Sequence, residues 1–204
     1  MSEPTSAREA ILGRVRAALA DSDRSEVTVP RGYRDRPTRE GLVERFVGRV
    51  EDYRATVTRS HATELESTLA FILPRDTRVL LAPDLPWPVP GIVDTGQSAA
   101  ELDDFGAVVT TATVGIAETG TIVLTHGPGE GRRALSLVPD LHVCVLRVDQ
   151  VVPDVPEAVA LLGPILAEGR PQTWISGPSA TSDIELDRVE GVHGPRTLHV
   201  VLVD

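Results

Sequence analysis

The sequence predicts an α/β sandwich with a largely parallel sheet. Its apolar runs are continuous instead of alternating, which is typical of strands that are covered on both faces. Segments with helical periodicity lie between these runs, and such alternation favours a parallel sheet. With 204 residues, of which 41% are hydrophobic, the chain is long enough for one domain with a sizeable core.

Residues 1–38 are predicted to form an N-terminal helix followed by an extended arm. Ser6 and Glu9 have the spacing of a capping box, and the apolar residues that follow recur at helical spacing, which indicates a helix over residues 6–19. Residues 21–38 are polar and contain prolines, so they are interpreted as a linker. The arm either folds on its own body or packs on a second subunit, so a homo-oligomer is one of two alternatives.

An α/β domain is predicted over residues 39–204. Apolar residues at helical spacing predict helices over residues 39–53, 61–73, 98–104 and 155–168. Apolar runs predict strands over residues 55–59, 77–82, 106–112, 121–125, 141–147, 172–176 and 197–203. The segment 83–97 is rich in proline and glycine and is predicted to be a loop, in which Trp87 is either core or an exposed contact residue.

Charge and residue usage exclude several classes of function. Thirty acidic and 20 basic residues give a net charge of −10, which argues against a nucleic-acid partner. Every basic residue is an arginine, so a lysine Schiff base and a P-loop lysine are excluded. Cys144 is the single cysteine, so no cysteine-ligated iron–sulfur cluster is expected in this chain. No apolar run approaches the roughly 18 residues of a membrane span, and we expect a cytoplasmic protein.

Several side chains in predicted strands are assigned structural roles. His142 and His199 are interpreted as core or sheet-edge histidines. Cys144 is expected to be a small buried hydrophobe with an inert thiol. Trp174 is expected in the core.

Three glycine-marked segments fall at predicted strand ends, and the first is residues 116–121. Glu118 follows a run of small and apolar residues, so its carboxylate is expected to be partly desolvated and able to act as acid, base or covalent nucleophile. Thr119 and Gly120 complete this candidate ligand-binding segment. The alternative is a turn in which Gly120 supplies a special backbone conformation.

The second segment, residues 126–133, is rich in glycine and ends in Arg132 and Arg133. Backbone amides beside glycines can converge on an anion, and arginines add charge and paired donors. The Gly-x-Gly-x-Gly spacing is not the dinucleotide fingerprint, and without lysine it is not a P-loop. A small anion is therefore the expected ligand, and a mobile hairpin is the alternative.

The third segment, residues 177–195, follows the predicted strand 172–176. Its three hydroxyls and a glycine suit a phosphate or carboxylate ligand, and the candidate ligand-binding residues of the whole segment are Gly177, Ser179, Thr181, Asp183, Glu185 and His193. The acidic residues and the histidine leave an oxygen and nitrogen metal site as a less favoured reading. Capped turns with a solvated acidic face are the other alternative.

The motifs in residues 116–124, 137–143, 177–185 and 191–195 occur in this order. Together they closely resemble the lactate-utilisation protein C family, the LutC/YkgG group, whose single domain is the LUD domain. The resemblance covers about residues 40–204. It implies a three-layer α/β/α sandwich similar to the NagB/RpiA/CoA-transferase superfamily. The family pattern often has an acidic residue near Thr113, and its absence here weakens a metal site.

The resemblance also implies a role in oxidising L-lactate to pyruvate, with partner subunits that include an iron–sulfur protein. This chain is then the member without a cofactor of its own. The leading hypothesis is a non-catalytic or co-catalytic subunit that binds a small anionic ligand or a partner at the three segments. Glu118 is its expected polar centre, Arg132 and Arg133 hold the anion, and the residues of the third segment line the opposite wall.

Two alternatives stay open at this point. The first is a stand-alone enzyme that resembles a CoA-transferase or a sugar-phosphate isomerase and uses Glu118 as nucleophile or base. The second is a sensor or scaffold with no chemistry.

Overall fold

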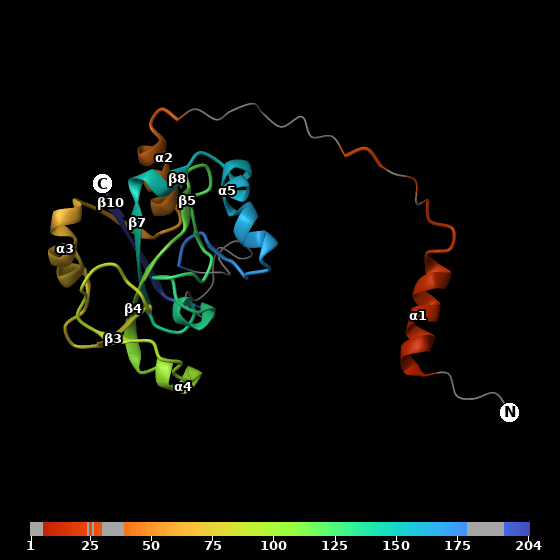
Figure 1. Cartoon of the computed structure of the whole chain (residues 1–204), viewed down its shortest axis with the longest axis horizontal. Helices are drawn as coiled ribbons and strands as arrows, with labels where there is room; N and C mark the ends of the chain where they lie inside the picture. The colour runs from red at the N-terminus through yellow and green to blue at the C-terminus, as the bar shows by residue number, and fades with distance from the viewer. Residues whose placement is uncertain (1–5, 24, 26, 30–38, 179–193) are drawn as a thin grey trace. The chain divides into compact units, whose positions relative to one another are not determined.

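The computed structural model describes residues 6–23, 25, 27–29, 39–178 and 194–204 (Figure 1). The chain divides into two compact units, Met1–Asp35 and Arg36–Asp204. The first contains α1 (Ala7–Ala18), at whose start Ser6 and Glu9 form the predicted capping box. This helix buries none of its residues.

The second unit is built on a six-stranded sheet in which every neighbouring pair of strands is parallel. In spatial order the strands are β1 (Thr56–Ser60), β10 (Thr197–Val203), β7 (Leu141–Arg147), β4 (Phe105–Thr111), β2 (Arg78–Leu81) and β3 (Ile92–Val93). The last strand of the chain, β10, is inserted between β1 and β7. The predicted α/β class with a mainly parallel sheet is confirmed.

A second sheet of four strands packs beside the first. Its order is β8 (Val151–Val152), β5 (Val114–Ile116), β6 (Thr121–Leu124) and β9 (Thr173–Ile175), and β6 runs antiparallel to both β5 and β9. The strands predicted over residues 121–125 and 172–176 therefore exist but lie outside the parallel sheet. Gly115 allows the two sheets to approach closely, because a Cβ at this position would lie 2.6 Å from Cδ2 of Leu146 in β7.

Helices and the small sheet cover both faces of the parallel sheet (Figure 1). On one face α3 (Leu65–Ile72) contributes to the core cluster that contains Val143 and Val145 of β7. On the other face α2 (Leu42–Asp52) and the small sheet share a cluster with Cys144 and Leu146. Successive residues of β7 thus serve opposite faces, which explains why its apolar run is continuous.

The remaining elements complete the layers. Helix α5 (Val155–Ala167) packs against the small sheet, and α4 (Ala99–Leu102) contributes Leu102 to a third cluster with β2 and β4. Three short 3-10 helices are η1 (Ala62–Glu64), η2 (Arg133–Ser136) and η3 (Val148–Gln150). Within the described ranges, we find no helix with the length and apolar character needed to cross a bilayer.

Candidate functional site

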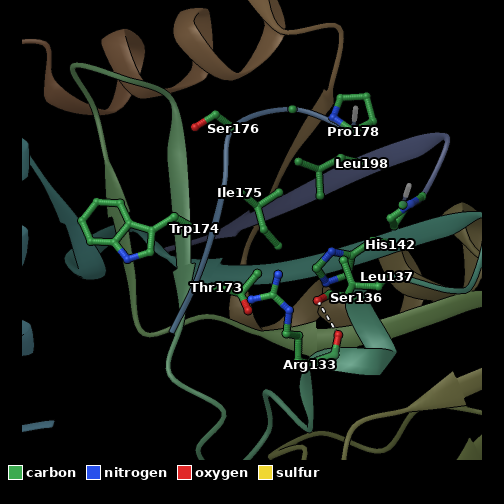
Figure 2. Close-up of a pocket in the computed structure, with 13 residues that line it drawn as sticks. Arg133, Ser136, Leu137, His142, Thr173, Trp174, Ile175, Ser176, Pro178 and Leu198 are labelled. Carbon is green, nitrogen blue, oxygen red and sulfur yellow. Dashed lines mark hydrogen bonds between the residues drawn. The ribbon is translucent and has the colours of Figure 1, made fainter. Parts of the chain in front are cut away.

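A cavity of about 280 Å³ lies between β9 and the amino-terminal ends of β7 and β10 (Figure 2). Its polar lining comes from Arg133 and Ser136 of η2, His142 of β7, and Thr173 and Ser176 in and after β9. Apolar side chains complete the lining on several sides, and they include Leu137, Ile175 and Leu198. The cavity therefore combines a few polar groups with an apolar wall, the usual composition of a small-molecule site.

Arg133 is the one charged side chain among the described residues that line this cavity. Its guanidinium has no ion pair and no hydrogen bond to any residue of the described chain, and it extends toward Thr173 in Figure 2. No aspartate or glutamate is among the lining residues that the structure describes. In a chain with a net charge of −10, this local positive charge favours an anionic ligand.

His142 forms part of the buried wall of the cavity and is 1% exposed. Its Nε2 lies 2.8 Å from Oγ1 of Thr110 in β4. Burial lowers the pKa of His142 to about 4, so the ring is neutral near pH 7. Its Nδ1 has no hydrogen-bond partner among the described residues, which leaves one ring nitrogen for a ligand.

Thr173 is hydrogen-bonded to His126, and the two hydrogen bonds of the His126 ring indicate which ring nitrogen carries the hydrogen. Nδ1 of His126 lies 2.8 Å from the carbonyl oxygen of Gly131, and Nε2 lies 2.9 Å from Oγ1 of Thr173. Because a carbonyl only accepts, Nδ1 carries the hydrogen and Nε2 accepts from the Thr173 hydroxyl. The lone pairs of Thr173 Oγ1 then remain available as acceptors.

A chain of hydroxyls joins the segment 116–121 to the cavity. Oγ1 of Thr121 lies 2.7 Å from Oγ1 of Thr119 and 2.7 Å from Oγ of Ser176. Ser176 lines the cavity. The predicted segment 116–121 is therefore joined by hydrogen bonds to Ser176, the residue between β9 and the third predicted segment.

Comparison with known proteins identifies the family. The model of the LUD domain matches residues 93–203, which contain every part of this cavity. The chain belongs to the LUD domain family. A Lactate utilization protein C from Deinococcus radiodurans is 47% identical over 172 residues, which cover 81% of each chain. The family resemblance seen in the sequence is thus confirmed.

Further relatives and a solved structure agree with this assignment. Proteins of the same name from Bacillus pumilus and Bacillus subtilis are 40% and 30% identical over 44% and 65% of this chain, and over 38% and 61% of their own lengths. The crystal structure of a DUF162 family protein from Deinococcus radiodurans has a TM-score of 0.69 and 39% sequence identity. It covers 83% of this chain and 100% of its own.

Glu118 of the LUD domain does not have the surroundings expected for it. Its side chain is exposed, while the residues before it are buried. Its backbone N–H donates to the carbonyl oxygen of Pro153 at 3.0 Å, so the turn is held by main-chain contacts. The partial desolvation predicted from the neighbouring apolar residues is wrong, because these side chains face the core and Glu118 faces solvent. A catalytic role for Glu118 stays a prediction.

The predicted glycines of the LUD domain pack closely on the end of α2. Gly120 has a φ of 60°, and a Cβ there would lie 2.6 Å from the carbonyl carbon of Arg49. Gly177 has a φ of 83°, and its Cβ would lie 2.8 Å from Cβ of Tyr53. Both positions require glycine for packing and backbone conformation, and their ligand-binding role stays a prediction.

Arg132 and Arg133, adjacent in sequence, have different surroundings. Arg132 donates from Nε and Nη2 to the carboxylate of Asp94 at 2.9 and 3.0 Å, and also to the carbonyl oxygen of Gln97. These hydrogen bonds lower the pKa of Asp94 and raise the pKa of Arg132. Arg132 is thus occupied by the protein's own carboxylate, and of this pair only Arg133 lines the cavity.

Glu130 is a buried carboxylate that the sequence reasoning missed. It is 4% exposed and accepts hydrogen bonds from Oγ1 of Thr113 at 2.5 Å, from N and Oγ1 of Thr125 at 2.5 and 3.1 Å, and from N of Gly127 at 3.3 Å. Two backbone amides of this region therefore bind an internal anion. The sequence signal that could have indicated it is the position of an acidic residue inside a glycine-rich segment.

The remaining predicted residues of the third segment lie outside the described residues: Ser179, Thr181, Asp183, Glu185 and His193. Their place opposite Arg133 stays a prediction. In the part of the chain that the structure describes, no group of three or more His, Cys, Asp or Glu residues is arranged to hold a metal ion.

Two structural assignments have opposite outcomes. Cys144 is buried as expected, and burial raises the pKa of its thiol to about 12. The expectation that Trp174 belongs to the core is wrong, because its side chain is 41% exposed and lines the cavity. The edge position of β9 in the small sheet leaves one side of the indole uncovered.

Proposed function

We propose that this LUD domain protein serves lactate utilisation and binds a small carboxylate, such as lactate or pyruvate, in the cavity of Figure 2. The observation that carries the ligand class is Arg133, a cation without a described partner in a lining whose described residues include no acidic side chain. The metabolic role is supported by relatives that bear the name Lactate utilization protein C.

The cavity suits the two ends of such a ligand. A guanidinium binds a carboxylate through two parallel N–H donors, which is the role we assign to Arg133. A hydroxyl group at the second carbon, as in lactate, then donates to Oγ1 of Thr173, and an oxo group, as in pyruvate, instead accepts from Nδ1 of His142. Ile175 and Leu198 contact the methyl group. A volume of about 280 Å³ is sufficient for a three-carbon acid.

We place the electron-transfer groups in partner subunits, including an iron–sulfur protein. A cluster needs several cysteine thiolates, and this chain has only Cys144, which is buried and whose thiol pKa is raised to about 12. The proposed contribution of this subunit is therefore to bind and orient the acid or its product while a partner accepts the electrons.

Calorimetric titration with pyruvate and with L-lactate tests the ligand. Arg133→Gln is expected to weaken binding at least tenfold, because the carboxylate loses its charged partner. Arg75→Gln removes the same charge from a different groove and is the matched control. Equal affinities for the two variants would contradict the proposal.

Affinity purification from lactate-grown cells tests the partners. The eluate is expected to contain an iron–sulfur protein and to reduce a dye when lactate is added. A partnerless eluate without this activity would refute a role in a complex.

The acyl-transfer alternative receives less support from the geometry, because Glu118 is exposed and does not line the cavity of Figure 2. Incubation with an acyl-CoA followed by hydroxylamine tests it. Modification of Glu118 under these conditions would favour a CoA-transferase over a binding subunit.

A further inference from the structure

A second cavity of about 520 Å³ lies at the carboxyl-terminal ends of β2, β4 and β7, and it shares no described lining residue with the cavity of Figure 2. Ligands of open α/β sheets bind beyond this edge. The proposal depends on lining side chains that end or follow three parallel strands or precede β9, and they are Asp84, Trp87, Thr111, Arg147 and Arg170. We propose that this second cavity binds a nucleoside phosphate.

Two arginines supply the phosphate contacts. Arg147 binds Asp149 through Nε and Nη2 at 2.9 and 3.2 Å, and Arg170 binds Glu168 at 3.2 and 2.9 Å. Both acidic partners are largely exposed, at 70% and 62%. Exposed ion pairs of this kind contribute little to stability, so a phosphate that enters the cavity can replace them. Guanidinium groups match phosphate oxygens with paired donors.

Asp84 supplies the group that a ribose needs. Its side chain lines the second cavity and has no hydrogen bond or ion pair among the described residues. Its φ is 62°, an uncommon conformation for a residue other than glycine. Such conformations gather at binding sites. A free carboxylate accepts hydrogen bonds from vicinal hydroxyls, which a phosphate alone does not possess, so Asp84 favours a nucleoside over a simple anion.

Trp87 supplies the surface for the base. The indole is partly buried against the core cluster that contains Leu81 and Val109, and it also lines the second cavity. It is therefore held in place by the core while remaining reachable from the cavity. A flat heterocycle stacks on such a ring regardless of which base it is.

Glu130 also lines the second cavity, and four hydrogen bonds hold its carboxylate in place. Its hydrogen bonds to Thr113 and Thr125 join the turn between β4 and β5 to the residue that follows β6. Gly129 connects this loop to the ends of β2 and β4. Its N–H donates to the carbonyl oxygen of Pro83 at 2.8 Å, and its carbonyl oxygen accepts from N of Thr111 at 2.7 Å. Such fixed surroundings reduce the ordering that a ligand must impose.

Fluorescence titration with ADP tests the second cavity. The chain has two tryptophans, so Trp174→Phe leaves Trp87 as the only indole reporter. In this background, ADP is expected to quench the emission in a saturable way. Arg170→Gln is expected to weaken ADP binding at least tenfold, and Arg75→Gln, which removes a charge from another groove, is the matched control.

Two further probes separate the base and ribose from the phosphates. Pyrophosphate is expected to bind more weakly than ADP and to leave the emission unchanged. Asp84→Asn is expected to weaken ADP several-fold and to spare pyrophosphate. The proposal is overturned if ADP neither quenches Trp87 nor gives heat in calorimetry, if Arg170→Gln binds ADP as the control does, or if pyrophosphate binds as tightly as ADP.

Discussion

His142 is expected to make the stability of this protein fall in mild acid. The side chain is 1% exposed, and burial lowers its pKa from an ordinary value of about 6.5 to about 4. Below about pH 6.5 the unfolded chain takes up a proton on this imidazole, whereas the folded protein takes it up only near pH 4. The unfolded state therefore binds more protons between these values, and the free energy of unfolding decreases as the pH falls through this window.

The size of the effect follows from the same two pKa values. Each pKa unit between the folded and unfolded states is worth about 1.4 kcal/mol, so the full effect of His142 approaches about 3 kcal/mol. At pH 5, where the unfolded imidazole is charged and the folded one is still neutral, about 2 kcal/mol is already lost relative to pH 7.5. With an m-value of roughly 2 kcal/mol/M, this corresponds to a midpoint lower by about 1 M urea.

Urea unfolding of the wild type and His142→Gln at pH 7.5 and pH 5 measures the effect. Other groups also titrate in this range, so the informative quantity is the difference between the two proteins in their loss of stability. We expect the variant to lose about 2 kcal/mol less than the wild type. His61→Gln, which changes an exposed histidine, is the control and is expected to follow the wild type. Equal losses in wild type and His142→Gln would refute the reasoning.

Three more predictions concern packing and internal charges. Gly120→Ala is expected to lower the free energy of unfolding, measured with urea, by about 3 kcal/mol, because its Cβ would meet the backbone of α2. Gly48→Ala, whose Cβ would have nothing within 4 Å, should raise the free energy of unfolding by up to about 1 kcal/mol. Equal effects of the two substitutions would contradict the clash at Gly120. A double-mutant cycle with Asp94→Ala and Arg132→Ala should give a coupling of about 2 kcal/mol at neutral pH, lost only below about pH 4 because the pKa of Asp94 is lowered. Glu130→Gln is expected to cost about 2 kcal/mol, since an amide cannot accept all four hydrogen bonds of the carboxylate; unchanged stability would show that Glu130 does not hold its loop.

Local patterns in the sequence were sufficient to predict the main strands and several helices. The runs that form β4, β7 and β10 are buried on both faces of the parallel sheet, so continuous apolar sequence was a reliable sign. The strands β3, β5 and β8 have two or three residues each, too few for a periodicity to be visible. Their existence depends on the partners beside them, which lie elsewhere in the chain.

The candidate site was only partly visible in the sequence. Arg133 was singled out because it follows a glycine-rich run, and it does line the cavity of Figure 2. Its neighbour Arg132 looked equivalent, yet an ion pair with Asp94, 38 positions away in the chain, occupies it. His142 was interpreted as a core histidine, and its burial bears this out, but the sequence could not reveal that its ring also faces a cavity.

The sequence by itself determined the family, the class of fold and the order of the longer strands and helices, because these depend on side-chain chemistry that is visible at short range. The tertiary structure decided which strands form a separate sheet, which arginine stays available, and which carboxylate is buried. Those properties depend on residues distant in the chain. The two adjacent arginines differ in role because Asp94 lies within reach of only one guanidinium.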